Sequence, residues 1–137
     1  MIVIDASALI AMMAGEAEAD GLADVMEADR IRFCSPISLW ETTAGLCRSY
    51  GFTAALARDK IHDFLSAHGI EVTIIGEREY ELAADAYVAF GKGRHPAALN
   101  MGDCFAYASA RAKNAALLFK GEDFSKTDIR IASMRGG

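Results

Sequence analysis

Short apolar runs alternate along the chain with longer segments in which apolar residues recur every three or four positions. The short runs are typical of strands that are buried on both faces, and they lie at residues 2–4, 31–34, 70–75, 116–119 and 129–132. The periodic segments predict helices from residue 6 to near 15, over 17–28, from 36 through 47, over 53–67, over 77–90 and from 100 onward. This alternation favours a single α/β domain with a mainly parallel, five-stranded sheet flanked by helices.

Two helix starts carry recognisable capping residues. Ser35 followed by Pro36 predicts an N-cap and a proline in the first turn. Asn100 predicts another N-cap, and Asp103, three positions on, can reach back to a free backbone amide. Capping alone would explain the aspartate, so any other role for it depends on the rest of the chain.

Composition limits the classes of protein to consider. No stretch approaches the roughly 18 consecutive apolar residues that a transmembrane helix needs. The first residues lack a basic segment and reach Asp5 too early for a signal peptide, so we expect a cytoplasmic protein without membrane contact. The three cysteines, Cys34, Cys47 and Cys104, lack metal-ligand spacing and are expected to be buried, reduced thiols.

The net charge of −5 argues against strong nonspecific binding to nucleic acid. One local exception is the basic segment 92–95, which contains Lys92, Arg94 and His95. These residues could contact RNA phosphates or form a solvated loop, and the sequence favours neither. Bound cations could also reverse the sign of the charge at an acidic site.

Four acidic residues stand where a parallel sheet places functional side chains. Asp5 follows the first predicted strand, Glu41 lies on the helix after the second, Asp103 begins the helix before the fourth, and Asp123 follows the fourth. Each has an ordinary explanation when taken alone, as a cap or a surface acid. Together they predict a convergence at the carboxyl ends of the strands, where α/β sheets bind ligands.

Carboxylates gathered in this way repel one another unless a cation lies among them. Oxygen ligands without companion cysteines or histidines favour Mg²⁺ or Mn²⁺ over Zn²⁺. Such an ion lowers the pKa of bound water and neutralises charge that develops on a phosphodiester. Ser7 is a further capping group or a neighbour that orients Asp5, and Asp128 lies a few residues beyond Asp123.

Several motifs together resemble the PIN-domain ribonucleases, and more narrowly the VapC toxins of bacterial type II toxin–antitoxin modules. They are MIVIDASAL at the start of the chain, Glu41 on its helix, LNMGDCFAYA at 99–108 and LLFKGEDFSKTDI at 117–129. The resemblance extends over residues 1–137, in the expected order. Its most specific part is the combination of Gly-Asp-Cys-Phe-Ala-Tyr with Leu-Leu-Phe-Lys-Gly-x-Asp-Phe.

The resemblance implies a PIN domain with five parallel strands and the activity of a Mg²⁺- or Mn²⁺-dependent endoribonuclease. Family members cut RNA, often tRNA at one defined site, and so stop translation. The resemblance also implies a VapB-type antitoxin that blocks the site, contact with operator DNA only through that antitoxin, and a homodimer.

By the same resemblance, Asp5, Glu41 and Asp103 match the three core acids of the family. Asp5 and Asp103 are the expected metal ligands, and Glu41 would complete the site and help to orient the attacking water. Ser7 matches the hydroxyl position beside the first acid. The fourth acid of many PIN domains falls here at Gly121, so Asp123 is the chosen substitute, with Asp128 behind it.

Two other functions fit parts of the pattern. Phosphoaspartate hydrolases also place an aspartate after the first strand, but their motif needs an acid two residues later, where this chain has Ser7. A PIN-like binding module without catalysis would need no complete set of acids. The aromatic residues Trp40, Phe105 and Tyr107 are expected in the core or at a dimer interface.

Overall fold

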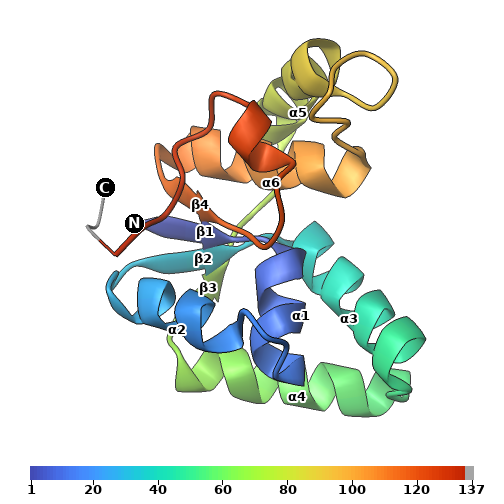
Figure 1. Cartoon of the computed structure of the whole chain (residues 1–137), viewed down its shortest axis with the longest axis vertical. Coiled ribbons are helices and arrows are strands. Elements are labelled where there is room, and N and C mark those ends of the chain that lie inside the picture. The colour runs from blue at the N-terminus through green and yellow to red at the C-terminus, as the bar shows by residue number, and fades with distance from the viewer. Residues whose placement is uncertain (135–137) are drawn as a thin grey trace.

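The computed structural model describes residues 1–134, which form a parallel sheet between two layers of helices (Figure 1). The strands are β1 (Ile2–Ile4), β2 (Arg32–Cys34), β3 (Ile70–Val72) and β4 (Ala116–Leu118). The helices are α1 (Ala6–Ala14), α2 (Ala19–Glu27), α3 (Pro36–Tyr50), α4 (Ala54–Ala67), α5 (Glu77–Phe90) and α6 (Met101–Lys113), with a 3₁₀ turn η1 (Phe124–Lys126). The predicted α/β class is confirmed.

The strands follow the order β3-β2-β1-β4, and every pair is parallel. The central strand β1 pairs Ile2 with Ala116 of β4 on one side and with Arg32 of β2 on the other. Because all strands run the same way, their carboxyl ends share one edge of the sheet. The segments that follow β1, β2 and β4 therefore start from that edge.

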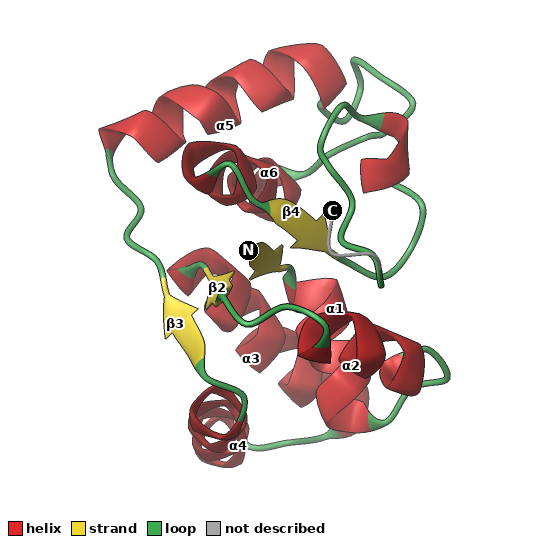
Figure 2. Cartoon of the chain, turned by 90° about the vertical axis from the view of Figure 1, so that its left-hand side faces the viewer, coloured by secondary structure: helices red, strands yellow, loops and turns green. Residues whose placement is uncertain are grey.

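Helices α1 to α4 cover one face of the sheet, and α5 and α6 cover the other (Figures 1 and 2). Alternate residues of β1 serve the two layers: Ile2 and Ile4 pack with the helices of the larger layer, whereas Val3 packs with α5 and α6. All three side chains are almost completely buried. The uniformly apolar sequence of this strand follows from having helices on both faces.

The prediction of a fifth strand at 129–132 is wrong, because the sheet has four strands within residues 1–134. This segment makes a single isolated bridge, Leu117 to Ile131, with the hydrogen bonds Leu117 N to Arg130 O at 2.8 Å and Ala132 N to Leu117 O at 3.0 Å. Only one residue of β4 is paired in this way, so no ladder develops. The apolar pattern instead reflects the burial of Ile129 and Ala132.

The structure also corrects the end of one strand and narrows the expected location of Trp40. Strand β3 ends at Val72 and not at residue 75, because the chain then crosses from the sheet edge toward α5 and leaves Ile74 exposed (Figure 2). Trp40 is 69% exposed, which excludes it from the core of this chain, so the dimer interface stays a prediction for this residue. Tyr107 is buried, as expected. The pattern of α3 placed Trp40 one position from Glu41 without revealing which of the two faces solvent.

The cysteines are free, as expected, with Cys34 and Cys104 buried and Cys47 half-buried. Across the described part of the chain, none of the helices combines the length and the apolar character needed to cross a bilayer.

Candidate active site

Asp5 is fixed at the point where β1 passes into α1. It is the N-cap of α1, and its backbone N–H donates to Leu118 O of β4 at 2.9 Å. Its Oδ2 accepts two hydrogen bonds from Ser7, one from the backbone N–H at 3.0 Å and one from Oγ at 2.6 Å. The side chain is 4% exposed, so this carboxylate is buried with hydroxyl and amide donors around it. Capping and a functional role are therefore compatible at this residue.

Asp103 is held by a capping box at the start of α6. Asn100 Oδ1 accepts from the Asp103 backbone N–H at 2.9 Å, and Asp103 Oδ2 accepts from the Asn100 N–H at 3.1 Å. The capping predicted for Asn100 is thereby confirmed. This arrangement fixes the backbone of the aspartate and one oxygen of its carboxylate at the carboxyl end of the sheet.

Glu41 reaches the same place from the opposite helical layer. Its carboxylate lies against the first turn of α6, at Gly102, where an added Cβ would collide with both carboxylate oxygens. A glycine at this position therefore allows the side chain of α3 to approach the backbone of α6. Sequence reasoning missed this role of Gly102, and the only available signal was a helix-disfavouring glycine in the first turn beside Asp103.

The three acids influence one another electrostatically. Burial raises the pKa of Asp5 and outweighs the Ser7 hydrogen bonds that lower it. Burial, followed by the charges of Asp5 and Asp103, raises the pKa of Glu41 to about 7. The pKa of Asp103 is raised to about 6 by burial and by the charges of Asp5 and Asp123, against the hydrogen bond from Asn100. These carboxylates therefore form one interacting cluster.

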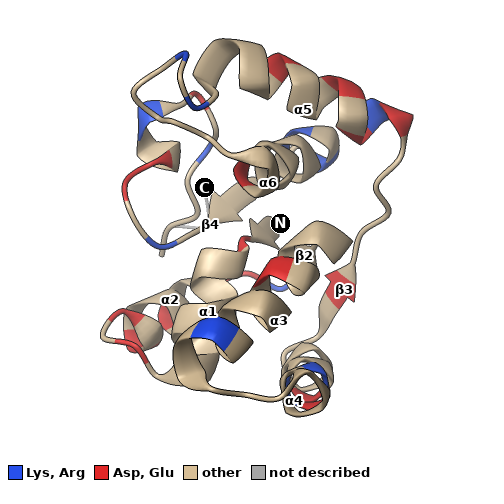
Figure 3. Ribbon diagram, turned by 90° about the vertical axis from the view of Figure 1, so that its right-hand side faces the viewer, with Lys and Arg blue, Asp and Glu red and all other residues tan. Residues whose placement is uncertain are grey.

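Within the part of the chain that the structure describes, no basic side chain neutralises this cluster. Every ion pair within residues 1–134 leaves out Asp5, Glu41, Asp103 and Asp123. In Figure 3 the acidic segments on α3 and at the start of α6 lie near the strand ends, on the two sides of the sheet. The local field is therefore strongly negative and attracts cations.

The structure separates the two candidates for the fourth acid. Asp123 immediately precedes η1 and lies close enough to Asp103 to raise the pKa of that residue. Asp128 instead accepts a hydrogen bond from Tyr107 Oη at 2.6 Å and lies 3.9 Å from the Arg111 guanidinium. The geometry thus brings Asp5, Glu41, Asp103 and Asp123 together, while Asp128 contacts the side of α6.

The fit to a divalent cation follows from the donor chemistry. All candidate ligands are carboxylate oxygens, and their mutual repulsion would be relieved by a hard cation. Among residues 1–134, however, no three or more acidic, histidine or cysteine side chains are already arranged as a metal-binding group. The residues present therefore suit Mg²⁺ or Mn²⁺ chemically, without forming a preassembled set of ligands.

The basic segment 92–95 lies between α5 and α6. A bridge between Gly91 and Leu99 closes this loop, and Arg94 lies over the Tyr87 ring at 4.9 Å. His95 Nδ1 accepts from the Ala97 N–H at 3.0 Å, so this ring helps to shape the loop. Beside it, a largely apolar groove of about 430 Å³ is lined by Tyr80, Ala83, Ala84, Tyr87, Lys92, Leu99, Asn100, Met101, Cys104 and Phe105.

Comparison with known proteins identifies the family to which this arrangement belongs. Residues 2–130 match the PIN domain. The chain belongs to the PIN-domain family. It is 38% identical over 132 residues to the VapC ribonuclease Mb0640 of Mycobacterium bovis, covering 96% of this chain and 98% of that protein. It is 36% identical over 127 residues to a ribonuclease VapC of Mycolicibacterium smegmatis, covering 93% and 96% of the two chains.

A solved PIN-domain structure supports the fold. The crystal structure of Mycobacterium tuberculosis VapC20, described as a sarcin-ricin loop cleaving toxin, aligns with a TM-score of 0.72 at 22% identity. The alignment covers 94% of this chain and 96% of that one. At this level of identity the likeness concerns the architecture, so the chemistry of the present PIN domain has to be argued from its own residues.

Proposed function

We propose that this PIN-domain protein is a metal-dependent endoribonuclease and the toxin of a VapBC-type toxin–antitoxin module. The observation that carries this proposal is the cluster of Asp5, Glu41 and Asp103, three carboxylates that have no basic partner within residues 1–134. The charge of Asp5 raises the pKa of both Glu41 and Asp103, and the charge of Asp103 further raises that of Glu41. A site of this kind costs stability unless it binds a cation. The VapC ribonucleases among its relatives support RNA as the substrate.

Each residue has a distinct role in the proposed reaction. Asp5 and Asp103 would hold Mg²⁺ or Mn²⁺, and Ser7 would keep the Asp5 carboxylate in a fixed orientation through its two hydrogen bonds. Glu41 would complete the site and orient the water that attacks the phosphodiester. A bound divalent ion would lower the pKa of a bound water molecule and neutralise negative charge that develops on the phosphate. Asp123, at the rim, would take the fourth acidic role.

The partners proposed for the protein are those of a VapC toxin. An RNA, with tRNA as the first candidate, would bind across the acidic end of the sheet, and a VapB-type antitoxin would block that end. Operator DNA would be contacted only through the antitoxin. Exposed apolar side chains near this end, Trp40 and Met101 among them, support a homodimer, because large exposed apolar side chains are common at interfaces.

The phosphoaspartate alternative is disfavoured by the geometry of Ser7. The position two residues after Asp5 would need a carboxylic acid that donates a proton, whereas the Ser7 hydroxyl already donates to Asp5 Oδ2. A binding module without catalysis stays the second candidate. It differs from the proposal in needing neither a divalent ion nor Glu41.

The decisive experiment is cleavage of total tRNA by the purified protein with Mg²⁺ or Mn²⁺, with EDTA as the metal-free control. We expect discrete fragments from the wild type and from Asp20→Asn, which changes a remote exposed acid of α2, and none from Asp103→Asn. Ribosomal RNA is the second substrate to test. Folded wild-type protein that cuts neither RNA with either metal would contradict the proposal and favour the binding module.

A further inference from the structure

Lys120 connects the candidate active site to two segments that lie outside it, the turn between α1 and α2 and the end of α3. It stands two residues after the end of β4, and the segment that follows β4 passes the start of α1 (Figure 1). Its backbone N–H donates to Ser7 Oγ at 3.0 Å, and Ser7 Oγ donates to Asp5 Oδ2 at 2.6 Å. The single hydroxyl hydrogen of Ser7 is therefore directed at Asp5, while the Ser7 oxygen accepts from the backbone of Lys120.

The side chain of Lys120 is anchored in a different direction. Its Nζ lies 2.6 Å from Glu16 Oε1 and 3.2 Å from Glu18 Oε2, in the turn between α1 and α2. The Glu16 carboxylate also accepts a hydrogen bond from the hydroxyl of Tyr50, the last residue of α3. These contacts join the turn after α1, the end of α3 and the segment after β4, and we refer to Lys120, Glu16, Glu18 and Tyr50 as the lysine clamp.

The lysine clamp lies at the base of the loop that carries Asp123. Gly121 follows Lys120 with φ +103°, a conformation that lets the chain reverse at once. Asp123 comes two residues later, and it is close enough to Asp103 to affect the pKa of that carboxyl. Any freedom of Lys120 would therefore be transmitted both to Asp5, through Ser7, and to the position of Asp123.

We propose that Lys120 is a positioning residue of the carboxylate site: its backbone orients Asp5 through Ser7, and its ammonium group fixes the Asp123 loop against α1 and α3. This proposal rests on the proposed metal-dependent function. The competing role for a lysine beside a nuclease site is direct contact with an RNA phosphate. The geometry favours positioning, because two carboxylates already hold the ammonium group, and their hydrogen bonds raise the pKa of Lys120.

The contribution of the lysine clamp to overall stability should be small. All of its charged members are at least partly exposed, and exposed ion pairs contribute little to the free energy of unfolding. Its effect should instead appear in the affinity of the site for metal and in turnover. Substitution of a residue that orients a metal ligand typically lowers metal affinity or activity by roughly 10- to 100-fold. This difference makes the proposal testable.

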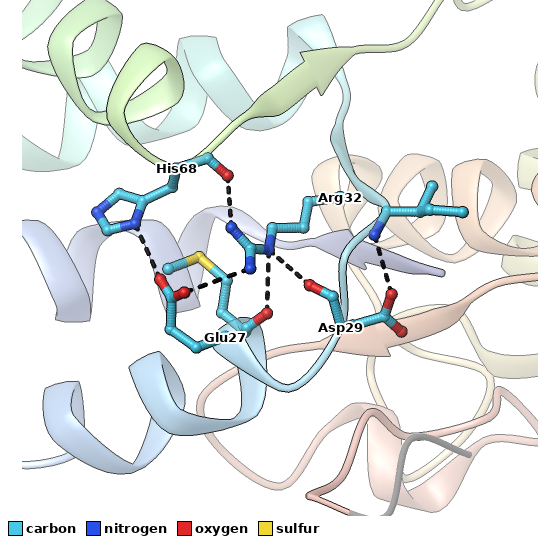
Figure 4. Close-up of polar contacts among 6 residues, drawn as sticks. Glu27, Asp29, Arg32 and His68 are labelled. Carbon is cyan, nitrogen blue, oxygen red and sulfur yellow. Dashed lines mark hydrogen bonds and ion pairs between the residues drawn. The ribbon is translucent and has the colours of Figure 1, made fainter.

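The test uses Mn²⁺ binding to the full-length protein, followed by electron paramagnetic resonance of the free ion, beside kcat and KM for RNA cleavage. Variants are Lys120→Met, Glu16→Gln and the exchanged pair Lys120→Glu with Glu16→Lys. Glu27→Gln is the matched control, because Glu27 also pairs with basic side chains (Figure 4) but lies at the amino end of the sheet, opposite Asp5, Glu41 and Asp103. Thermal melts verify that each variant is folded.

We expect Lys120→Met and Glu16→Gln each to weaken Mn²⁺ binding and to lower kcat by roughly 10-fold, with KM nearly constant. The exchanged pair should recover part of both losses, since it restores the contact between positions 120 and 16 with the charges reversed, whereas Glu18 then faces a carboxylate. Glu27→Gln should match the wild type. A phosphate contact predicts the opposite: unchanged Mn²⁺ affinity, a raised KM for Lys120→Met and a still higher KM for the exchanged pair. That result would overturn the proposal while leaving the nuclease intact.

Failure of the proposed function would look different. Wild-type protein that binds no Mn²⁺ and cuts no RNA would remove the basis of both proposals. Wild-type protein that binds and cuts, together with a Lys120→Met variant that equals it in Mn²⁺ affinity and kcat, would reject the positioning role alone.

Discussion

The carboxylates at the two ends of the sheet have different neighbours: basic groups at the amino end and other carboxylates at the carboxyl end. At the amino end, Glu27 contacts Arg32 at 3.4 Å and His68 at 3.1 Å (Figure 4). The Arg32 guanidinium donates further hydrogen bonds to backbone carbonyls, including that of His68 at 2.6 Å. At the carboxyl end, Asp5, Glu41 and Asp103 have one another and uncharged donors as neighbours.

The pKa values of Asp29 and Asp5 are shifted in opposite directions. Burial acts to raise the pKa of both carboxyls. At Asp29 the hydrogen bond and charge of the Met1 amino group, 2.6 Å away, help to bring the net pKa below its ordinary value. At Asp5 the donors are only the Ser7 hydroxyl and backbone amides, and burial prevails. One end thus neutralises its acids internally, whereas the acids at the other end have no basic partner within residues 1–134.

The same substitution at the two ends should therefore have opposite consequences. Asp103→Asn removes a repelling charge, so in EDTA at pH 8 the variant should melt at or above the temperature of the wild type, while RNA cleavage falls by more than about 100-fold. Asp29→Asn removes an ion pair, so it should lower the free energy of unfolding by about 1 kcal/mol and leave cleavage unchanged. Thermal melts and cleavage assays on both variants measure this. An unfolded Asp103→Asn protein would contradict the comparison.

Gly102 allows a sharper test of how the acidic end is built. Gly102→Ala should force Glu41 away from α6, with a cost of about 1–3 kcal/mol in unfolding free energy and a loss of at least roughly 10-fold in cleavage. The matched control is Gly21→Ala in α2, where an added Cβ meets nothing within 4 Å. That variant should gain up to about 1 kcal/mol and cleave normally. Chemical denaturation and kinetics measure both. Equal behaviour of the two variants would show that the approach of Glu41 to Gly102 is unimportant.

Much of this fold can be predicted from local pattern. The apolar run of β1 is followed by a helix start and that of β4 follows a helix end, and Asn100 and Ser35 cap their helices as expected. The failures concern interactions that local pattern does not contain. Whether Ile131 pairs along a full strand or at one bridge depends on the path of the preceding loop, and the end of β3 depends on where α5 lies.

For the candidate site too, the order of elements predicts some features, and others depend on tertiary packing. The order of elements in a parallel sheet predicts that Asp5, Glu41 and Asp103 meet, because Asp5 follows β1, Glu41 lies on the helix after β2 and Asp103 begins the helix before β4. It cannot predict the contact between Glu41 and Gly102, which requires the packing of α3 against α6. Nor can it separate Asp123 from Asp128, since only the three-dimensional structure shows that Tyr107 and Arg111 engage Asp128.

The pH dependence of stability offers the smallest and most specific effect. The pKa of Glu41 rises from 4.5 to about 7 on folding, and that of Asp103 from 3.8 to about 6. A group whose pKa is higher in the folded state stabilises the protein fully below its unfolded pKa, and this contribution is lost as pH rises through the folded pKa. The melting temperature in EDTA should therefore decrease between about pH 4.5 and 7 on account of these two residues.

Other groups titrate in this range, so the informative quantity is the difference between the wild type and Glu41→Gln. In EDTA the variant should gain stability relative to the wild type as pH rises from 5 to 8, because it carries no charge at this position. Excess Mn²⁺ at pH 8 should raise the melting temperature of the wild type more than that of the variant, since binding to the folded state is linked to stability. If the difference in stability between the two proteins is constant from pH 5 to 8 and does not change with Mn²⁺, Glu41 is neutralised within the chain. The carboxyl end would then resemble the amino end, and the proposed metal site would lose its electrostatic basis.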